Sequence, residues 1–201
     1  MLRLTLPIFG LLVFLKPAFT QERSFNILLG ILPYTTEFGS TSSVQWKPRL
    51  GFVLGLDYWA KNKKGEVWSA GISYQTFKRR GDVTSNGQTF PQEETFEYLN
   101  LHGAPLIWQF GKKEQFFAEV GGFFNFLLHQ EAESRGNVVD NTPLFQKIYL
   151  GPSAGIGARL GDPGGSKLII GLRNELGLAS FGSGSVSAKF NTFSLYVGLG
   201  I

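Results

Sequence analysis

The chain has 201 residues with 26 Gly, 19 Phe and no Cys, which excludes disulfides, thiolate metal sites and a lipid-modified N-terminal Cys. At this length one domain can bury a full core, and frequent Gly and Phe favour strands and tight turns over long helices. The formal charge of +4 becomes +2 once Arg3 and Lys16 are subtracted, so the basic pI does not indicate a nucleic-acid partner.

The first 20 residues have the layout of a secretory signal peptide. Arg3 gives a basic start, residues 4–15 form an apolar run, and small residues at Ala18 and Thr20 precede a polar Gln21. A membrane-anchoring helix would need about 20 apolar residues, and Lys16 followed by Pro ends the run too early. We therefore predict a signal peptide over residues 1–20, cleaved after Thr20, and a single domain over residues 21–201.

Beyond the signal peptide the sequence divides into segments in which apolar residues alternate with small or polar ones, the period of a β-strand with one apolar face. A strand crosses a bilayer at a tilt with about 9 to 11 residues, and each segment is at least that long. The eight predicted strands cover residues 24–34, 48–60, 66–78, 96–110, 115–130, 146–160, 167–179 and 190–201.

The connections between these strands alternate between short and long. Residues 61–65, 111–114 and 161–166 are short and rich in Gly, Asn, Asp and Pro, as tight turns are. Residues 35–47, 79–95, 131–145 and 180–189 are longer and polar. Outer-membrane barrels have short periplasmic turns and long extracellular loops. The pattern predicts an all-β fold, an eight-stranded antiparallel up-and-down transmembrane β-barrel with both ends of the domain in the periplasm.

The two faces of the predicted strands differ in a way that favours a membrane barrel over a soluble one. Leu195, Val197 and Leu199 share one face, whereas Ser194 and Gly198 share the other. A soluble lipocalin-like barrel would turn the apolar face inward and cover its outside with Lys, Glu and Thr. The second face here carries mostly Gly, Ser and Asn, which suit the narrow interior of an eight-stranded barrel.

Outward-facing aromatic residues gather near the predicted periplasmic turns. Such residues form girdles at the membrane interface. We predict a girdle of Tyr58, Trp68, Trp108, Phe110 and Phe116.

Odd- and even-numbered residues of a strand point to opposite faces, which we call their parity. The parity of the apolar residues changes partway along the fourth predicted strand. Leu99 and Leu101 share one parity, and Leu106 has the other. A β-bulge over residues 103–105, Gly-Ala-Pro, would return both halves to one lipid face, since Pro is tolerated at bulges.

Several stretches resemble the outer-membrane β-barrel family that includes PorT-like proteins. They are FEYLNLHGAPLIWQFG at 96–111, FFAEVGGFFN at 116–125, GPSAGIGARL at 151–160, LIIGLRNELGL at 168–178 and the closing FSLYVGLGI. The resemblance implies a small outer-membrane barrel with a signal peptide, and many members have no assigned function. Two departures are Asn100, where the family has an acidic residue, and Ile201, where outer-membrane proteins often end in an aromatic residue.

Five charged residues have the parity of the barrel interior: Asp57, Glu119, Arg159, Arg173 and Glu175. An unpaired buried charge costs several kcal/mol, so we expect these side chains to pair across the lumen, with Glu119 and Arg159 as one pair. A polar path for small ions is the alternative, although an eight-stranded barrel is just wide enough for side chains to fill it.

No motif for chemistry stands out in the sequence. His102 and His129 lack a neighbouring Ser in a recognisable nucleophile motif, and two histidines with scattered carboxylates show no metal-ligand spacing. GDPGGS at 161–166 is a strand-joining turn with no helix after it, not a phosphate-binding loop. We expect no catalytic, cofactor or metal site.

The sequence thus predicts an outer-membrane protein of structural or surface-interaction type, whose long loops carry polar residues outward. A narrow passive channel is one alternative, and a lipid-modifying enzyme of the lipid A type is another. Expected partners are outer-membrane lipids, the barrel-assembly machinery and periplasmic chaperones, with an unknown ligand for the loops and no nucleic acid.

Overall fold

The computed structural model describes residues 20–38, 44–85, 87–111, 115–161, 165–178 and 189–201. Apart from Thr20, the predicted signal peptide lies outside these residues. Within the described part of the chain, no helix is both long enough and apolar enough to cross a membrane. The elements are β1 (Thr20–Phe38), β2 (Lys47–Asn62), β3 (Val67–Ser85), β4 (Gln88–Phe110), β5 (Phe116–Ser134), β6 (Asn137–Asp140), η3 (Thr142–Leu144), β7 (Ile148–Leu160), β8 (Lys167–Leu176) and β9 (Lys189–Gly200).

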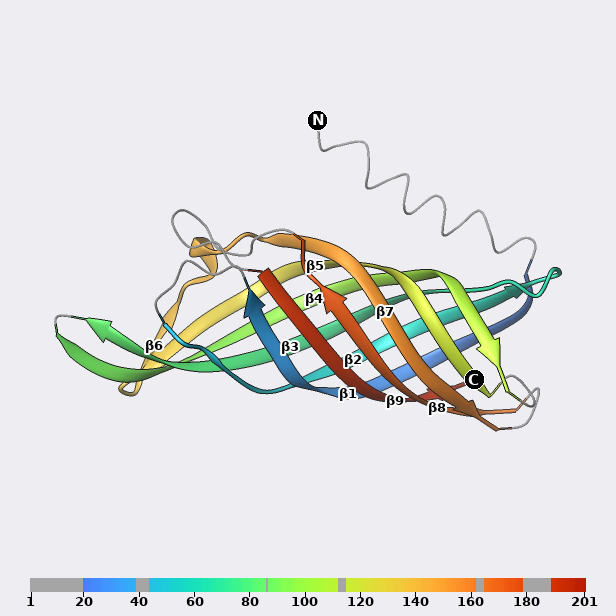
Figure 1. Ribbon diagram of the computed structural model, residues 1–201, viewed down its shortest axis with the longest axis horizontal. Helices are drawn as coiled ribbons and strands as arrows, with labels where there is room; N and C mark the ends of the chain where they lie inside the picture. The colour runs from blue at the N-terminus through green and yellow to red at the C-terminus, as the bar shows by residue number, and fades with distance from the viewer. Residues whose placement is uncertain (1–19, 39–43, 86, 112–114, 162–164, 179–188) are drawn as a thin grey trace, which may run out of the picture.

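Eight of these strands close into a ring, as the sequence predicted. The hydrogen-bonded order is β4-β3-β2-β1-β9-β8-β7-β5, and β5 returns to β4. Every neighbouring pair is antiparallel. Figure 1 shows the strands running obliquely around the long axis, with the C-terminus at the same end as the β2–β3 turn. We call this the turn end and the opposite one the hairpin end.

The apolar face of each strand points out of the ring. Leu195 is 44% exposed, whereas Ser194 beside it is 9% exposed, and Leu54 and Val53 on β2 alternate in the same way. A lipocalin-like barrel would have the opposite arrangement, with its apolar side chains lining the interior. The wall is thus apolar outside, and the small and polar residues of the alternation face the lumen together with a set of buried apolar side chains.

The predicted bulge in the fourth strand is confirmed. The β4–β5 register shifts between Gly103 and Leu106, and Leu101 and Leu106 on either side of it are both exposed. The bulge therefore keeps Leu101 and Leu106 on the same outer face of β4.

Four residues at the start of the predicted loop 35–47 belong to β1. Two other predicted loops are wrong in larger part, because the neighbouring strands continue into them. β3 and β4 extend through 79–85 and 88–95 until Ser85 pairs with Gln88, and Gly87 has a φ of 75°. β5 likewise continues to Ser134 and pairs with β6, through a turn in which Arg135 and Gly136 have φ of 52° and 76°. Positive φ at the turn matches the twist of antiparallel strands and lets the hairpins continue. These segments form a hairpin extension beyond the ring (Figure 1).

Candidate functional site: the filled lumen

The lumen contains two apolar layers with a polar belt between them. Each layer is a cluster of buried residues from many strands. The upper layer, toward the hairpin end, contains Leu32, Val53, Phe77, Phe96, Tyr98, Phe123, Leu127, Tyr149 and Phe190. The lower layer, toward the turn end, contains Leu28, Trp59, Val67, Ala104, Ile107, Phe117, Ile169 and Tyr196. On β2, Asp57 lies between Val53 of one layer and Trp59 of the other, and β4 and β5 place polar residues in the same way.

The belt is organised around the guanidinium of Arg173, on β8. Its Nε donates to Glu119 Oε1 at 2.8 Å, and its Nη2 donates to Asp57 Oδ2 at 3.4 Å. The other oxygen of Asp57 accepts a hydrogen bond from His102 Nε2. All four side chains are buried. Each charged group thus has a charged partner, which a buried charge requires.

The network continues from His102 to amides and a second acid. His102 Nδ1 donates to Asn100 Oδ1 at 2.7 Å. Asn100 Nδ2 in turn donates to Asn125 Oδ1 at 2.7 Å and to Glu175 Oε1 at 3.1 Å. Both ring nitrogens of His102 therefore face oxygen acceptors. The complete chain links side chains of β2, β4, β5 and β8 across the barrel, so it fastens opposite walls to each other.

Four of the five predicted lumenal charges meet in the belt, and Arg159 does not. The expected pair of Glu119 with Arg159 is wrong, since Glu119 bonds to Arg173. Arg159 instead donates to Ser24 Oγ at 2.8 Å. The strand register explains the difference: Glu119 lies opposite Gly155, four residues before Arg159 on β7, which amounts to about 13 Å along the strand.

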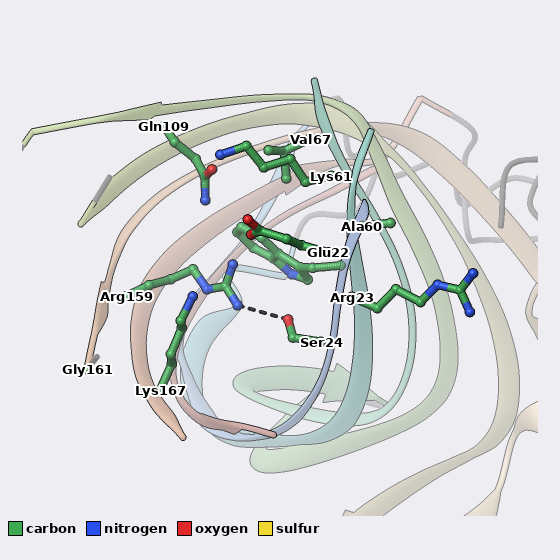
Figure 2. Close-up of a pocket in the computed structure, with 11 residues that line it drawn as sticks. Glu22, Arg23, Ser24, Ala60, Lys61, Val67, Gln109, Arg159, Gly161 and Lys167 are labelled. Carbon is green, nitrogen blue, oxygen red and sulfur yellow. Dashed lines mark hydrogen bonds between the residues drawn. The ribbon is translucent and has the colours of Figure 1, made fainter. Parts of the chain in front are cut away.

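Arg159 lies in a cavity of about 90 Å³ at the turn end, lined also by Glu22, Ser24, Trp59, Gln109 and Lys167. Figure 2 shows Arg159 and Lys167 side by side facing Ser24, with Arg23 directed away from them. The Arg159 guanidinium stacks on the Trp59 ring, 4.6 Å from its centroid. Because Trp59 and Val67 belong to the lower apolar layer, the cavity ends at that layer.

Another buried cation, Arg79, lies toward the hairpin end of the lumen. Arg79 pairs with Glu94 at 2.6 Å. Its guanidinium also lies 4.1 Å from the ring centroid of Trp46 and 5.2 Å from that of Phe96 in the upper layer. A cation held between a carboxylate and aromatic faces is stabilised by both contacts. It therefore covers the upper layer on the side of the hairpin extension.

The predicted girdle residues do not share one environment. Trp108, Phe110 and Phe116 are exposed on the outer wall, and the rings of Phe110 and Phe116 stack at 5.9 Å. Trp68 differs from the expectation, because it is only 8% exposed and packs edge-on against Tyr58 at 5.6 Å. The β3–β4 register shifts between Val67 and Ser69, on either side of Trp68. Three of the five rings are therefore exposed on the outer wall, and Trp68 is not.

The sequence reasoning missed the amides and the imidazole of the belt. From the sequence, His102 is weighed as a catalytic or metal-binding residue and not as a structural one, although Asn100 and His102 have the same parity as Tyr98, which is a lumenal position. That parity was the available signal. The described residues contain no group of three or more His, Asp or Glu side chains placed to hold a metal ion.

Comparisons with protein-family models and with curated proteins found no match for the chain. Among solved structures, Neisserial surface protein A has 10% sequence identity and a TM-score of 0.48, over 89% of this chain and 95% of that one. Outer membrane protein OprG from Pseudomonas aeruginosa has 12% identity and a TM-score of 0.45, over 90% and 96%. Ail, the attachment invasion locus protein of Yersinia pestis, has 14% identity and a TM-score of 0.44, over 89% and 97%. These values are too low to carry a function from those proteins to this chain.

Proposed function

We propose that the protein is an integral outer-membrane β-barrel of structural or surface-interaction type, with a lumen closed by side chains. The observation that supports this most directly is the outer wall, where large apolar side chains are exposed on every strand of the ring, for example Phe25, Leu54, Ile72, Leu106, Val120, Ile156, Ile170 and Leu195. A soluble monomer rarely exposes so continuous an apolar surface. Lipid is the solvent that such a wall requires.

The filled lumen favours this function over a narrow passive channel. An ion entering from the turn end would meet Trp59, Phe117 and Ile169 of the lower layer, and then the bonded belt. Moving a belt residue aside would leave its partner as an unpaired buried charge, at a cost of several kcal/mol. The same burial opposes a lipid-modifying activity at His102, because its ring is enclosed between the layers.

The hairpin extension is the part of the molecule that we propose to act outside the cell. It carries exposed polar and charged side chains on four strand segments, on a rigid base formed by the ring. The proposed partners of the whole protein during insertion are outer-membrane lipids, the barrel-assembly machinery and periplasmic chaperones. The resemblance to PorT-like proteins in particular also stays a prediction.

Two measurements test this function. Outer-membrane fractions, extracted with detergent, should contain the protein, and an unboiled sample should migrate differently from a boiled one on a gel. In planar bilayers the wild-type protein should give no conductance steps. Recovery in the soluble fraction without a gel shift would refute the membrane barrel, whereas reproducible conductance would keep the barrel and replace the closed lumen by a channel.

A further inference from the structure

Four cations lie together on the outer wall at the hairpin end of β2 and β3. Arg49 is directly opposite Lys78, and Lys47 is directly opposite Arg80. Lys78 and Arg80 have the same parity on β3 as Ile72, which is exposed on the outer wall. Because paired residues of antiparallel strands share a face, all four side chains lie on the outside. We call these four residues the basic quartet.

The quartet places like charges in direct cross-strand contact, an arrangement that destabilises a sheet. None of the four makes an ion pair within 4.0 Å with any acidic side chain that the structure describes. The neighbouring Arg79, which points into the lumen, does have such a partner in Glu94. Among the quartet, Arg80 alone lies opposite an acid on β4, Glu93, whereas Lys78 lies opposite Thr95. The facing pair of Arg49 and Lys78 is thus the part most in need of an external anion.

The height of the quartet indicates where that anion comes from. Lys78 is ten residues beyond Trp68 on β3, or about 33 Å along the strand. With a strand tilt of about 40°, this corresponds to about 25 Å along the barrel axis, the height of the apolar band of an outer-membrane barrel. Leu50 and Phe52, which follow Arg49 on β2 toward the turn end, are exposed on the apolar wall directly below the quartet. The quartet therefore lies at the upper edge of the apolar wall, at the level of the outer-leaflet headgroups.

We propose that the basic quartet binds the phosphate groups of a phosphorylated lipid in the outer leaflet, of the lipid A type. The acyl chains of such a lipid would lie against the apolar wall below, and its phosphates would separate the facing cations. Guanidinium groups suit phosphate oxygens because they donate two parallel hydrogen bonds. This proposal rests on the proposed function, since it requires the wall to face an outer leaflet.

A matched pair of variants tests the proposal. Arg49→Gln with Lys78→Gln removes two charges from the quartet, and Lys63→Gln with Lys64→Gln removes two charges from the exposed β2–β3 turn at the other end. Native mass spectrometry of the refolded proteins in detergent measures binding of lipid A carrying two phosphates and of the same lipid with its phosphates removed. Each basic residue near an anionic lipid surface contributes about 1 kcal/mol to binding. Because the quartet variant loses two of them, it should bind the phosphorylated lipid about 30-fold more weakly.

The turn variant should keep wild-type affinity, and the dephosphorylated lipid should bind wild type at least as weakly as phosphorylated lipid binds the quartet variant, which keeps Lys47 and Arg80. Equal losses in both variants, or equal binding of the two lipids by wild type, would overturn the proposal.

A second readout is the urea midpoint in vesicles. The quartet variant should have a higher midpoint than wild type in zwitterionic lipid and a lower one in phosphorylated lipid. The unboiled gel shift of each sample separates this test from that of the proposed function, because it reports whether the barrel has formed.

Discussion

Arg173 donates to Glu119 at 2.8 Å between β8 and β5, two strands separated in the ring by β7. The contact passes over β7, where Gly155 lies opposite both residues, and it is not part of any strand pairing. It therefore ties β8 to β5 independently of the backbone ladder. The same guanidinium reaches Asp57 on β2, so three strands depend on a single side chain.

The pair of Glu119 and Arg173 should be strongly non-additive in unfolding experiments. Glu119→Gln or Arg173→Met leaves the other charge buried and should cost about 3 to 5 kcal/mol, while the double variant should cost much less than the sum. Urea unfolding in vesicles measures the three free energies. Glu119→Gln with Arg159→Gln is the control, because no bond joins these two residues, and there the losses should add. Additive losses for Glu119 and Arg173 would show that the ion pair does not form.

A charge introduced at mid-height on the apolar wall should impair folding into a bilayer, whereas a charge at the hairpin end should be tolerated. Leu195→Arg replaces a residue that is 44% exposed in the middle of β9 and should cost about 2 to 4 kcal/mol if the side chain faces lipid near the midplane. Leu144→Arg is the matched control, since Leu144 is 59% exposed on η3, outside the ring. Folding yield into liposomes measures both. Equal tolerance of the two changes would mean that the wall faces water.

Gly71 should be required by the polar belt. A Cβ at this position would meet the Asp57 carboxylate and the His102 ring, so Gly71→Ala should force the two apart and cost about 1 to 3 kcal/mol. Gly103→Ala on the neighbouring strand is the control, because its Cβ would come no closer than 3.4 Å to another atom, Ser69 O. The urea midpoint should fall clearly for Gly71→Ala and change little for Gly103→Ala. The reverse order would contradict the packing of the belt.

In the hairpin extension, Asp140 should titrate below the ordinary range of an Asp. Hydrogen bonds from the Thr142 side chain and from its backbone N–H, the latter at 2.8 Å, lower the pKa of Asp140. Because the pKa of Asp140 is lower in the folded protein than in the unfolded chain, its ionised carboxylate stabilises the β6 turn at pH values above the unfolded-state pKa. This stabilisation is lost as the pH falls through the folded-state pKa. Thr142→Val should raise the pKa toward its ordinary value in a carbon NMR titration. An unchanged pKa in this variant would contradict the assigned cause.

Residue parity explains why much of this fold could be predicted from the sequence. A period of two assigns Leu195 to the wall and Ser194 to the lumen without any knowledge of neighbouring strands. The parity change between Leu101 and Leu106 likewise predicted the bulge in β4. In the hairpin extension the two sequence signals disagree, because Asn86-Gly87 favours a hairpin, whereas the polar composition of residues 79–95 favours a loop.

The partners within the lumen could not be predicted in the same way. Parity placed Glu119 and Arg159 in the lumen but gave no depth, and depth depends on the stagger of each strand relative to its neighbours. Glu119 and Arg173 come from strands that are not neighbours in the ring. Both residues lie opposite Gly155 on β7, so their contact depends on the register of β7 with each of its neighbours, which no single strand encodes.

The most direct test of the central claim compares two tryptophans on opposite sides of the wall. Trp108 is 53% exposed on the outside, whereas Trp59 is 3% exposed in the lower apolar layer. Two variants, each retaining one of them and with Phe at the other Trp positions, can be refolded into vesicles whose acyl chains carry bromine. We predict strong quenching of Trp108 fluorescence by the brominated lipid and little quenching of Trp59. Quenching of Trp59 as strong as that of Trp108, or no quenching of Trp108, would contradict a barrel with a lipid-facing wall and a filled lumen.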